Sequence, residues 1–163
     1  MPPANLQDLL IEELRDTLSA EKQLTKALPK MAAACSSPIL RKGFEKHLRE
    51  TENHVERLKK VFELLGETAR AKTCKAMQGL IEEGADIIAE NSDLATKDAA
   101  LIAAAQKVEH YEIAAYGTMA TWARLLGQKK VLALLVQTLG EEKATDEKLT
   151  QVAETMVNEA AAD

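Results

Sequence analysis

Aromatic residues are scarce in this chain of 163 residues, where one Trp, two Tyr and two Phe make up 3% of the sequence. Proline is also rare, and its four copies all lie before position 40. The hydrophobic content of 46% comes mainly from Ala and Leu, which are strong helix formers. The composition therefore predicts an all-α protein, and the length is that of one domain covering residues 1–163.

Other absences narrow the class of protein further. Cys35 and Cys74 have neither metal-ligand nor disulfide-framework spacing, so we expect two reduced thiols. The net charge is −5, and no run of Lys or Arg alternates with aromatics, which argues against a nucleic-acid partner. No apolar run approaches the ~20 residues of a membrane span. The start "MPPANLQDLLIEEL" lacks the pattern of a signal peptide, so we expect a cytoplasmic protein.

Apolar residues recur at helical spacing over four long segments. They predict helices over residues 5–35, 38–66, 96–127 and 128–158. Asn5 is a plausible N-cap, Pro38 suits a first helical turn, and Gly66 and Gly127 suit helix ends. The long connection between the second and third helices contains residues 74–91, whose own helical period predicts a short fifth helix.

The lengths of the connections predict the topology. The first and second helices, and likewise the third and fourth, are joined by short links and should form antiparallel hairpins. A helix of ~28 residues is roughly 42 Å long, and about 30 residues with a helical insert can cross that distance. The third helix would then run parallel to the second. One long crossover in a four-helix bundle is the ferritin-like arrangement.

Acidic residues interrupt the apolar seams of these helices near their middles. Glu21 lies in the seam of the first helix, Glu112 in that of the third, and Glu142 and Asp146 in that of the fourth. The second helix is less regular, and Glu50 and His54 lie on the shoulder of its seam, four residues apart on one face. No Lys or Arg interrupts the seams of the other three long helices.

Distances along the chain place these carboxylates at matching heights. Glu21 and Glu50 each lie about 14 residues from the link between the first two helices, and Glu112 and Glu142 each lie about 15 from Gly127. In an antiparallel hairpin, equal distances from the turn mean equal height. Buried carboxylates need partners, and two divalent cations would balance their charge. Iron is the first choice of metal and manganese the second. The alternative is a polar layer of protonated carboxylates and water.

Several neighbours of these residues have open roles. Glu109 lies one turn from Glu112 and would either bridge two ions or support the ligands. His47 is expected to support the ligands or lie at the surface. Tyr111 and Tyr116 would donate hydrogen bonds near the site or pack in the core.

Four segments carry a resemblance to a known family. These are "SAEKQLTKALPKM", "HLRETENHVERL", "LIAAAQKVEHYEIAAYGTMA" and "LGEEKATDEKLT". Across residues 6–153 the chain closely resembles the YciE/YciF family of ferritin-like bacterial stress proteins. The resemblance implies a ferritin-like bundle, a homodimer, a role in general or osmotic stress and a di-metal centre, without supplying a reaction.

The ferritin-like ligand pattern transfers to this chain with one departure. It implies ligation by Glu21, Glu50, Glu112 (or Glu109) and Glu142. Where the pattern has His, three residues after the second and fourth of these, the chain has Asn53 and Thr145. His54 and Asp146 fall one residue later, as terminal ligands or as groups that orient the ligands.

The implied activities fall into different classes. An active di-metal centre would act on a small oxidant, O₂ or peroxide, or on Fe(II) as substrate. The second hypothesis is a stress protein without enzymatic activity, whose bundle dimerises or binds a partner. A storage cage is a third.

Overall fold

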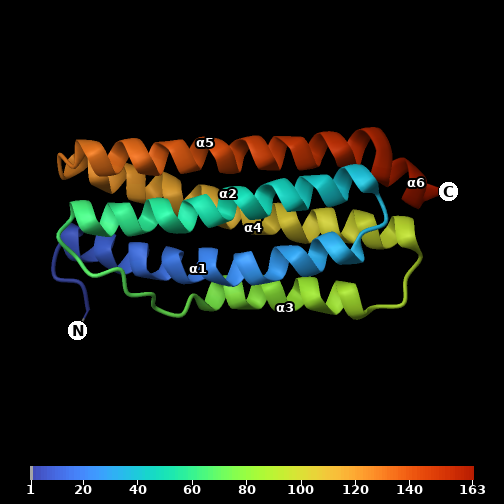
Figure 1. The fold of residues 1–163 in the computed structure, drawn as a ribbon, viewed down its shortest axis with the longest axis horizontal. Helices are drawn as coiled ribbons and strands as arrows, with labels where there is room; N and C mark the ends of the chain where they lie inside the picture. Colours follow the sequence, from blue (N-terminus) through green and yellow to red (C-terminus); the bar gives the residue numbers. More distant parts are fainter. Residues whose placement is uncertain (1) are drawn as a thin grey trace.

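The structure, a computed structural model, describes residues 2–163 and contains helices but no strands in that part of the chain. The bundle consists of α1 (Leu6–Ala34), α2 (Pro38–Leu64), α4 (Leu94–Leu125) and α5 (Lys129–Val152). The shorter α3 (Lys75–Ala89) lies alongside the bundle (Figure 1). Beyond α5 the chain continues through a π-helical segment (Ala153–Val157) into α6 (Asn158–Ala162), past the end expected at 158.

Local sequence explains where the helices begin and end. The side chains of Asn5, Ser37 and Asp93 each accept a hydrogen bond from the backbone N–H three residues later, which caps α1, α2 and α4. Because Asp93 is the cap, α4 begins two residues before the expected position 96. Gly66 and Gly127 both adopt φ of 70°, a left-handed conformation that favours glycine and ends α2 and α4.

The predicted topology is confirmed. Helices α1 and α2 form one antiparallel hairpin and α4 and α5 form the other, while α2 and α4 run parallel (Figure 1). The crossover between α2 and α4 runs the length of the bundle and carries α3, which packs against α1 and α4. Asp98 of α4 holds the turn between α1 and α2, because its carboxylate accepts hydrogen bonds from Ser36 N, Ser36 Oγ and Ser37 N at 2.7–2.8 Å.

The core consists of two apolar clusters, which occupy opposite ends of the bundle. The α1–α2 end cluster includes Leu24, Leu28, Leu40, Phe44 and Leu101, with Met77 of α3. The α4–α5 end cluster includes Leu10, Leu14, Leu58, Phe62 and Leu135. Each long helix buries one or two ionisable residues where it passes from one cluster to the other: Glu21, His47 and His54, Glu109 and Glu112, and Glu142. A polar layer therefore lies near the middle of the bundle. The buried Asp98, in contrast, lies at the α1–α2 end.

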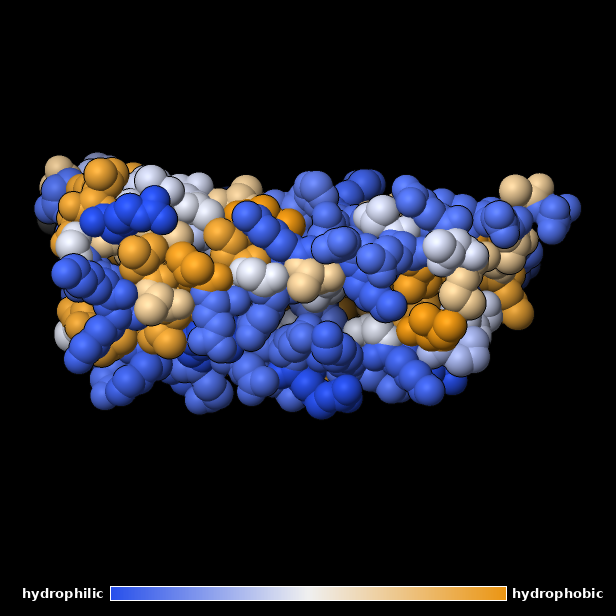
Figure 2. Space-filling model, turned by 90° about the horizontal axis from the view of Figure 1, so that it is seen from above, coloured by the Kyte–Doolittle hydropathy of each residue, from blue (hydrophilic) through white to orange (hydrophobic). Residues whose placement is uncertain are grey.

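Most of the surface seen from above is polar (Figure 2). Apolar side chains gather most densely at the end where α4 turns into α5, where Leu125 and Val136 are among the exposed hydrophobic residues. Within residues 2–163, no helix combines the length and the apolar character that crossing a membrane requires.

Candidate metal centre

The polar layer contains six ionisable side chains, none of them more than 4% exposed. They are Glu21 of α1, His47 and His54 of α2, Glu109 and Glu112 of α4, and Glu142 of α5. All four long helices thus contribute to one buried group of four carboxylates and two imidazoles.

These side chains form two donor clusters that share one residue. The first donor cluster comprises Glu21, His54, Glu112 and Glu142, each with a potential ligand atom within 4.8 Å of the others. In it, His54 Nδ1 lies 2.9 Å from Glu142 Oε1 and 3.3 Å from Glu21 Oε1. The second donor cluster comprises His47, Glu109 and Glu142. Here His47 Nε2 lies 2.7 Å from Glu109 Oε1 and 4.0 Å from Glu142 Oε2.

Most of the polar atoms in the two clusters lack hydrogen bonds. Within residues 2–163, nine buried side-chain polar atoms have no hydrogen-bond partner, and eight belong to these six residues. The short distances above therefore join charged groups that are close but not aligned as hydrogen bonds. Since a buried polar atom without a partner costs about 1–3 kcal/mol or more, this concentration is unfavourable without a compensating group. A cation among the oxygen and nitrogen atoms would provide it.

A chain of contacts behind His54 fixes the orientation of its ring. The Nε2 atom of His54 lies 2.8 Å from Glu141 Oε2. Arg57 donates to the same oxygen at 2.7 Å and to Thr138 Oγ1 at 2.7 Å. When Nε2 carries the proton, Nδ1 presents its lone pair to the carboxylates of the first donor cluster, as in histidines that bind metals. Arg57 is thus a supporting residue, because it holds Glu141 beside His54.

The two tyrosines adjacent to the centre have different partners. Tyr116 O–H donates to Glu21 Oε1 at 2.5 Å and fixes that carboxylate. Tyr111 O–H donates instead to Asp16 Oδ2 at 2.7 Å, outside the donor clusters, and lies 3.0 Å from Cys74 Sγ. Of the two roles considered for these residues, the hydrogen bond near the site belongs to Tyr116.

The electrostatics of the centre reflect crowding of negative charge. Burial, reinforced by neighbouring carboxylates, raises the pKa of Glu21, Glu109 and Glu112. Burial would also raise the pKa of Glu142, but its contacts with Glu109 and His54 outweigh burial and lower it to about 2. With protons alone to balance the charge, some of these carboxyl groups would have to stay protonated.

The pKa values of the two imidazoles are raised as well, by the same crowding of negative charge. Burial lowers the pKa of both, but nearby carboxylates outweigh it. The pKa of His54 is raised to about 10 by Glu142 and Glu21, and the pKa of His47 lies well above its usual value because of Glu109 and Glu50. Both rings thus lie in surroundings that favour positive charge, whether it is a proton on the ring or a cation beside it.

The structure brings together five of the seven residues proposed from the sequence. Glu21, His54, Glu109, Glu112 and Glu142 belong to the donor clusters, with Glu109 and Glu112 in separate clusters. Glu50 and Asp146 belong to neither.

Those two residues lie at the rim of the polar layer. The Glu50 side chain is 23% exposed, 3.2 Å from Lys46 Nζ and 3.7 Å from His47 Nδ1. Asp146 is half-buried and lies 3.1 Å from the exposed His110. The ferritin-like pattern implied that Glu50 joins Glu21 as a ligand, but Glu50 lies outside both donor clusters.

His47 lies deeper in the bundle than its sequence indicates. The sequence predicts a residue that supports the ligands or lies at the surface, but the ring is buried beside Glu109. The buried face of α2 includes His47, Thr51, His54 and Leu58, which follow one another at spacings of four, three and four. The spacing of seven between the two histidines, two helical turns on one face, was the available signal.

The donor set matches a di-iron bundle in number but not in arrangement. Such bundles have a Glu on each of two helices and a Glu-x-x-His pair on each of the other two. Here too there are four Glu and two His, but both histidines come from α2 and two glutamates from α4. Thr145, where the pattern has His, has its Oγ1 3.5 Å from His47 Nδ1, while Asn53 is exposed.

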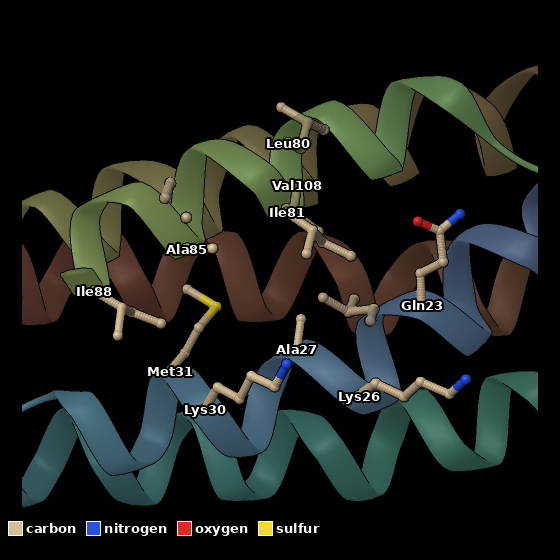
Figure 3. A pocket seen from close by; sticks show the side chains of 13 residues that line it. Gln23, Lys26, Ala27, Lys30, Met31, Leu80, Ile81, Ala85, Ile88 and Val108 are labelled. Atoms are coloured by element: carbon tan, nitrogen blue, oxygen red, sulfur yellow. The ribbon is translucent and has the colours of Figure 1, made fainter.

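Two cavities lie near the polar layer, and only the smaller adjoins the donors. A cavity of about 60 Å³ is lined by residues of α2, α4 and α5, including His47, Glu50 and Glu109. A larger groove of about 250 Å³ lies between α1, α3 and α4, with Lys26 and Lys30 beside mainly apolar side chains (Figure 3). Among the described residues that line this groove, none belongs to a donor cluster.

A four-helix bundle with one long crossover, carrying four Glu and two His in its core, has the architecture of the ferritin-like class. Residues 5–162 match the family described as "Domain of unknown function (DUF892)". The chain is also 51% identical over 157 residues to Protein YciF of Escherichia coli (strain K12), covering 96% of this chain and 95% of that protein. The chain therefore belongs to the DUF892 family and is a relative of YciF, which confirms the resemblance found in the sequence.

Solved structures agree with the fold. The crystal structure of the E. coli stress protein YciF matches with a TM-score of 0.92, covering 95% of this chain and 98% of that one. YcfI, a proposed structural protein from Rhodopseudomonas palustris, matches with a TM-score of 0.91 and 44% identity, covering 93% and 97%. A Xanthomonas campestris protein of 23% identity shares the fold, with a TM-score of 0.77 and 94% of each chain covered.

Proposed function

We propose that the protein binds two divalent cations in its polar layer, with iron as the first choice and manganese as the second. The observation that carries the proposal is the set of eight buried donor atoms without hydrogen-bond partners among residues 2–163, all on the six side chains of the polar layer. Carboxylate oxygens with a few imidazole nitrogens are a ligand set that suits these metals.

In this proposal each side chain of the polar layer has a role. Glu21, His54 and Glu112 would hold the first ion, and His47 and Glu109 the second. Glu142, which belongs to both donor clusters, would bridge the ions. Four ionised carboxylates balance two divalent cations, so that the site would be neutral overall, which lowers the cost of burying the charges.

The protein's own groups would prepare the site for small-molecule chemistry. Tyr116 and the Arg57–Glu141 pair hold Glu21 and His54 in place, and the two apolar end clusters limit the access of bulk water. Protons held by Glu109 and Glu112 would leave as metal enters, since ligands bind deprotonated. Bound iron would supply redox chemistry towards O₂ or peroxide, or be itself the Fe(II) that is oxidised. A stress-related role, as in the E. coli relative, would accord with either reaction.

Metal analysis of protein purified without chelators tests the proposal. We expect two ions per chain, identified by anomalous scattering at the iron and manganese edges. At free metal 1,000 times above Kd, each ion should add about 4 kcal/mol to the free energy of unfolding, and EDTA should remove it. The matched control is Glu147→Gln on the exposed face of α5, which should keep this response. Protein that stays metal-free in excess Fe(II) and Mn(II) would contradict the proposal.

The second candidate is a structural bundle in which the polar layer specifies how the helices pack. Its support is that the imidazoles already compensate two carboxylates, His47 beside Glu109 and His54 beside Glu142, and that the R. palustris relative is a proposed structural protein. In that case EDTA would leave the unfolding curve unchanged.

A further inference from the structure

We infer that Glu50 is the outer residue of a route by which cations reach the centre, through the cavity between α2, α4 and α5. The inference rests on the proposed function, because it concerns how the same centre is filled. Glu50 is the glutamate that the ferritin-like pattern places among the ligands and the structure places at the rim.

The cavity connects the rim to the second donor cluster alone. Its lining includes Glu50 at the outer side and His47 and Glu109 at the inner side. Among the described lining residues, none of the three that are unique to the first donor cluster is present. Both inner residues are buried and have an atom without a hydrogen-bond partner within residues 2–163: Nε2 of His47 and Oε2 of Glu109. An ion entering here would meet the second donor cluster first.

Ligand atoms follow one another from the surface inwards at short steps. Glu50 Oε2 lies 3.7 Å from His47 Nδ1, and His47 Nε2 lies 2.7 Å from Glu109 Oε1 and 4.0 Å from Glu142 Oε2. Side-chain exposure falls along this path from 23% at Glu50 to 5% at His47 and 0% at Glu142. An ion could therefore exchange its water molecules for protein ligands one at a time.

The size of the cavity suits this exchange, while its lining also includes the basic side chains of Lys46 and Lys148. Its volume of about 60 Å³ is roughly that of two water molecules in the liquid, enough for an ion that has lost part of its hydration shell. Gly43, Ala105 and Ala144 in the lining have small or no side chains and leave this space open. Thr145 Oγ1 donates to Glu50 Oε2 at 3.5 Å and helps to orient the carboxylate towards His47.

Lys46 is the competitor for Glu50. Its ammonium lies 3.2 Å from Glu50 Oε1, but the side chain is 70% exposed, and such pairs at the surface are weak. An incoming divalent cation would displace it. Lys46 would therefore slow entry without determining how much metal is finally bound.

The rate of metal loading tests the route separately from the centre itself. Metal-stripped protein is mixed with Co²⁺, a probe for divalent cations, and its visible absorption is followed by stopped flow. We expect Glu50→Gln to slow loading about 10-fold, the low end of electrostatic steering effects on association, with unchanged final stoichiometry. Lys46→Gln should speed loading. The matched control is Glu52→Gln, an exposed glutamate on α2 outside the cavity lining.

Each outcome has a distinct meaning. Loading of Glu50→Gln at the wild-type rate would overturn the route while leaving the centre intact. A loss of bound Co²⁺ at equilibrium in Glu50→Gln would overturn it too, because Glu50 would then be a resident ligand. Equal slowing by Glu52→Gln would reduce the effect to general surface charge and overturn the role of this cavity. Wild-type protein that takes up neither Co²⁺ nor Fe(II) nor Mn(II) would instead refute the proposed function.

Discussion

The middle and the ends of this bundle are equally buried but chemically opposite. At both ends the four long helices bury Leu, Ala, Val and Phe, whereas in the middle they bury four carboxylates and two imidazoles. Burying apolar side chains stabilises the fold directly. Burying ionisable groups with unpartnered atoms destabilises it unless a counter-charge is present. The apolar ends therefore supply the stability that offsets the cost of burying the ionisable groups in the middle.

The two ends also differ from each other. At the α1–α2 end, Cys74, which caps α3, and Met77 of α3 join the cluster, and further residues of α3 pack against it. The cluster at the α4–α5 end is built from the four long helices alone. The larger groove lies under α3, where this short helix meets α1 and α4 (Figure 3). The middle layer, in contrast, is assembled entirely from the four long helices.

The largest expected effect on stability comes from an end of the bundle. Leu14→Ala removes a fully buried side chain from the α4–α5 end cluster and should lower the free energy of unfolding by about 2–5 kcal/mol. Urea denaturation measures this loss, and metal stoichiometry should stay unchanged. Leu125→Ala, at a side chain 73% exposed, is the control and should change stability by no more than about 0.5 kcal/mol. A loss of stability in Leu14→Ala as small as that of the control would contradict the stabilising role of the apolar ends.

The middle should respond with the opposite sign. Glu112→Leu replaces two buried oxygens without hydrogen-bond partners among the described residues by an apolar group of similar size. In EDTA the variant should gain about 1–3 kcal/mol of unfolding free energy, because a desolvation cost disappears, while Co²⁺ binding falls. Glu147→Leu, an exposed site on α5, controls for added hydrophobicity. If Glu112→Leu is less stable than wild type in EDTA, the carboxylate is satisfied by ordered water and the middle is not a cost to the fold.

The sequence was sufficient to predict the helices, the crossover and the depth of the site. Periodicity and link lengths carry that information. The seams of α1 and α5 placed Glu21 and Glu142 in the interior, where both are buried, but Asp146 of the same α5 seam lies at the rim. The sequence was not sufficient for the rotation of α2 about its axis. The apolar residues of α2 fit two helical faces that are offset by one residue. The sequence therefore indicates an outer position for His47 and a position for Glu50 that is too far inside. Only the packing of all neighbouring helices selects the phase, since a straight helix drifts about 20° per heptad.

The smallest expected change in the free energy of unfolding comes from a residue outside the polar layer. Arg57→Gln removes the guanidinium that holds Glu141 against His54. Because the Arg57–Glu141 pair is partly exposed, the metal-free protein should lose at most about 1 kcal/mol of unfolding free energy.

Affinity should respond far more than stability does. Without Glu141 held in place, the His54 ring is free to turn, and Co²⁺ affinity measured by competition with a chelator should fall about 10–100-fold. Lys59→Gln, which removes an exposed partner of Glu56 on the same helix, should leave affinity unchanged. Equal affinities in Arg57→Gln and wild type would mean that packing alone orients His54. A fall in affinity without a matching fall in stability would instead show that this support, unlike the apolar ends, serves ligand geometry rather than the fold.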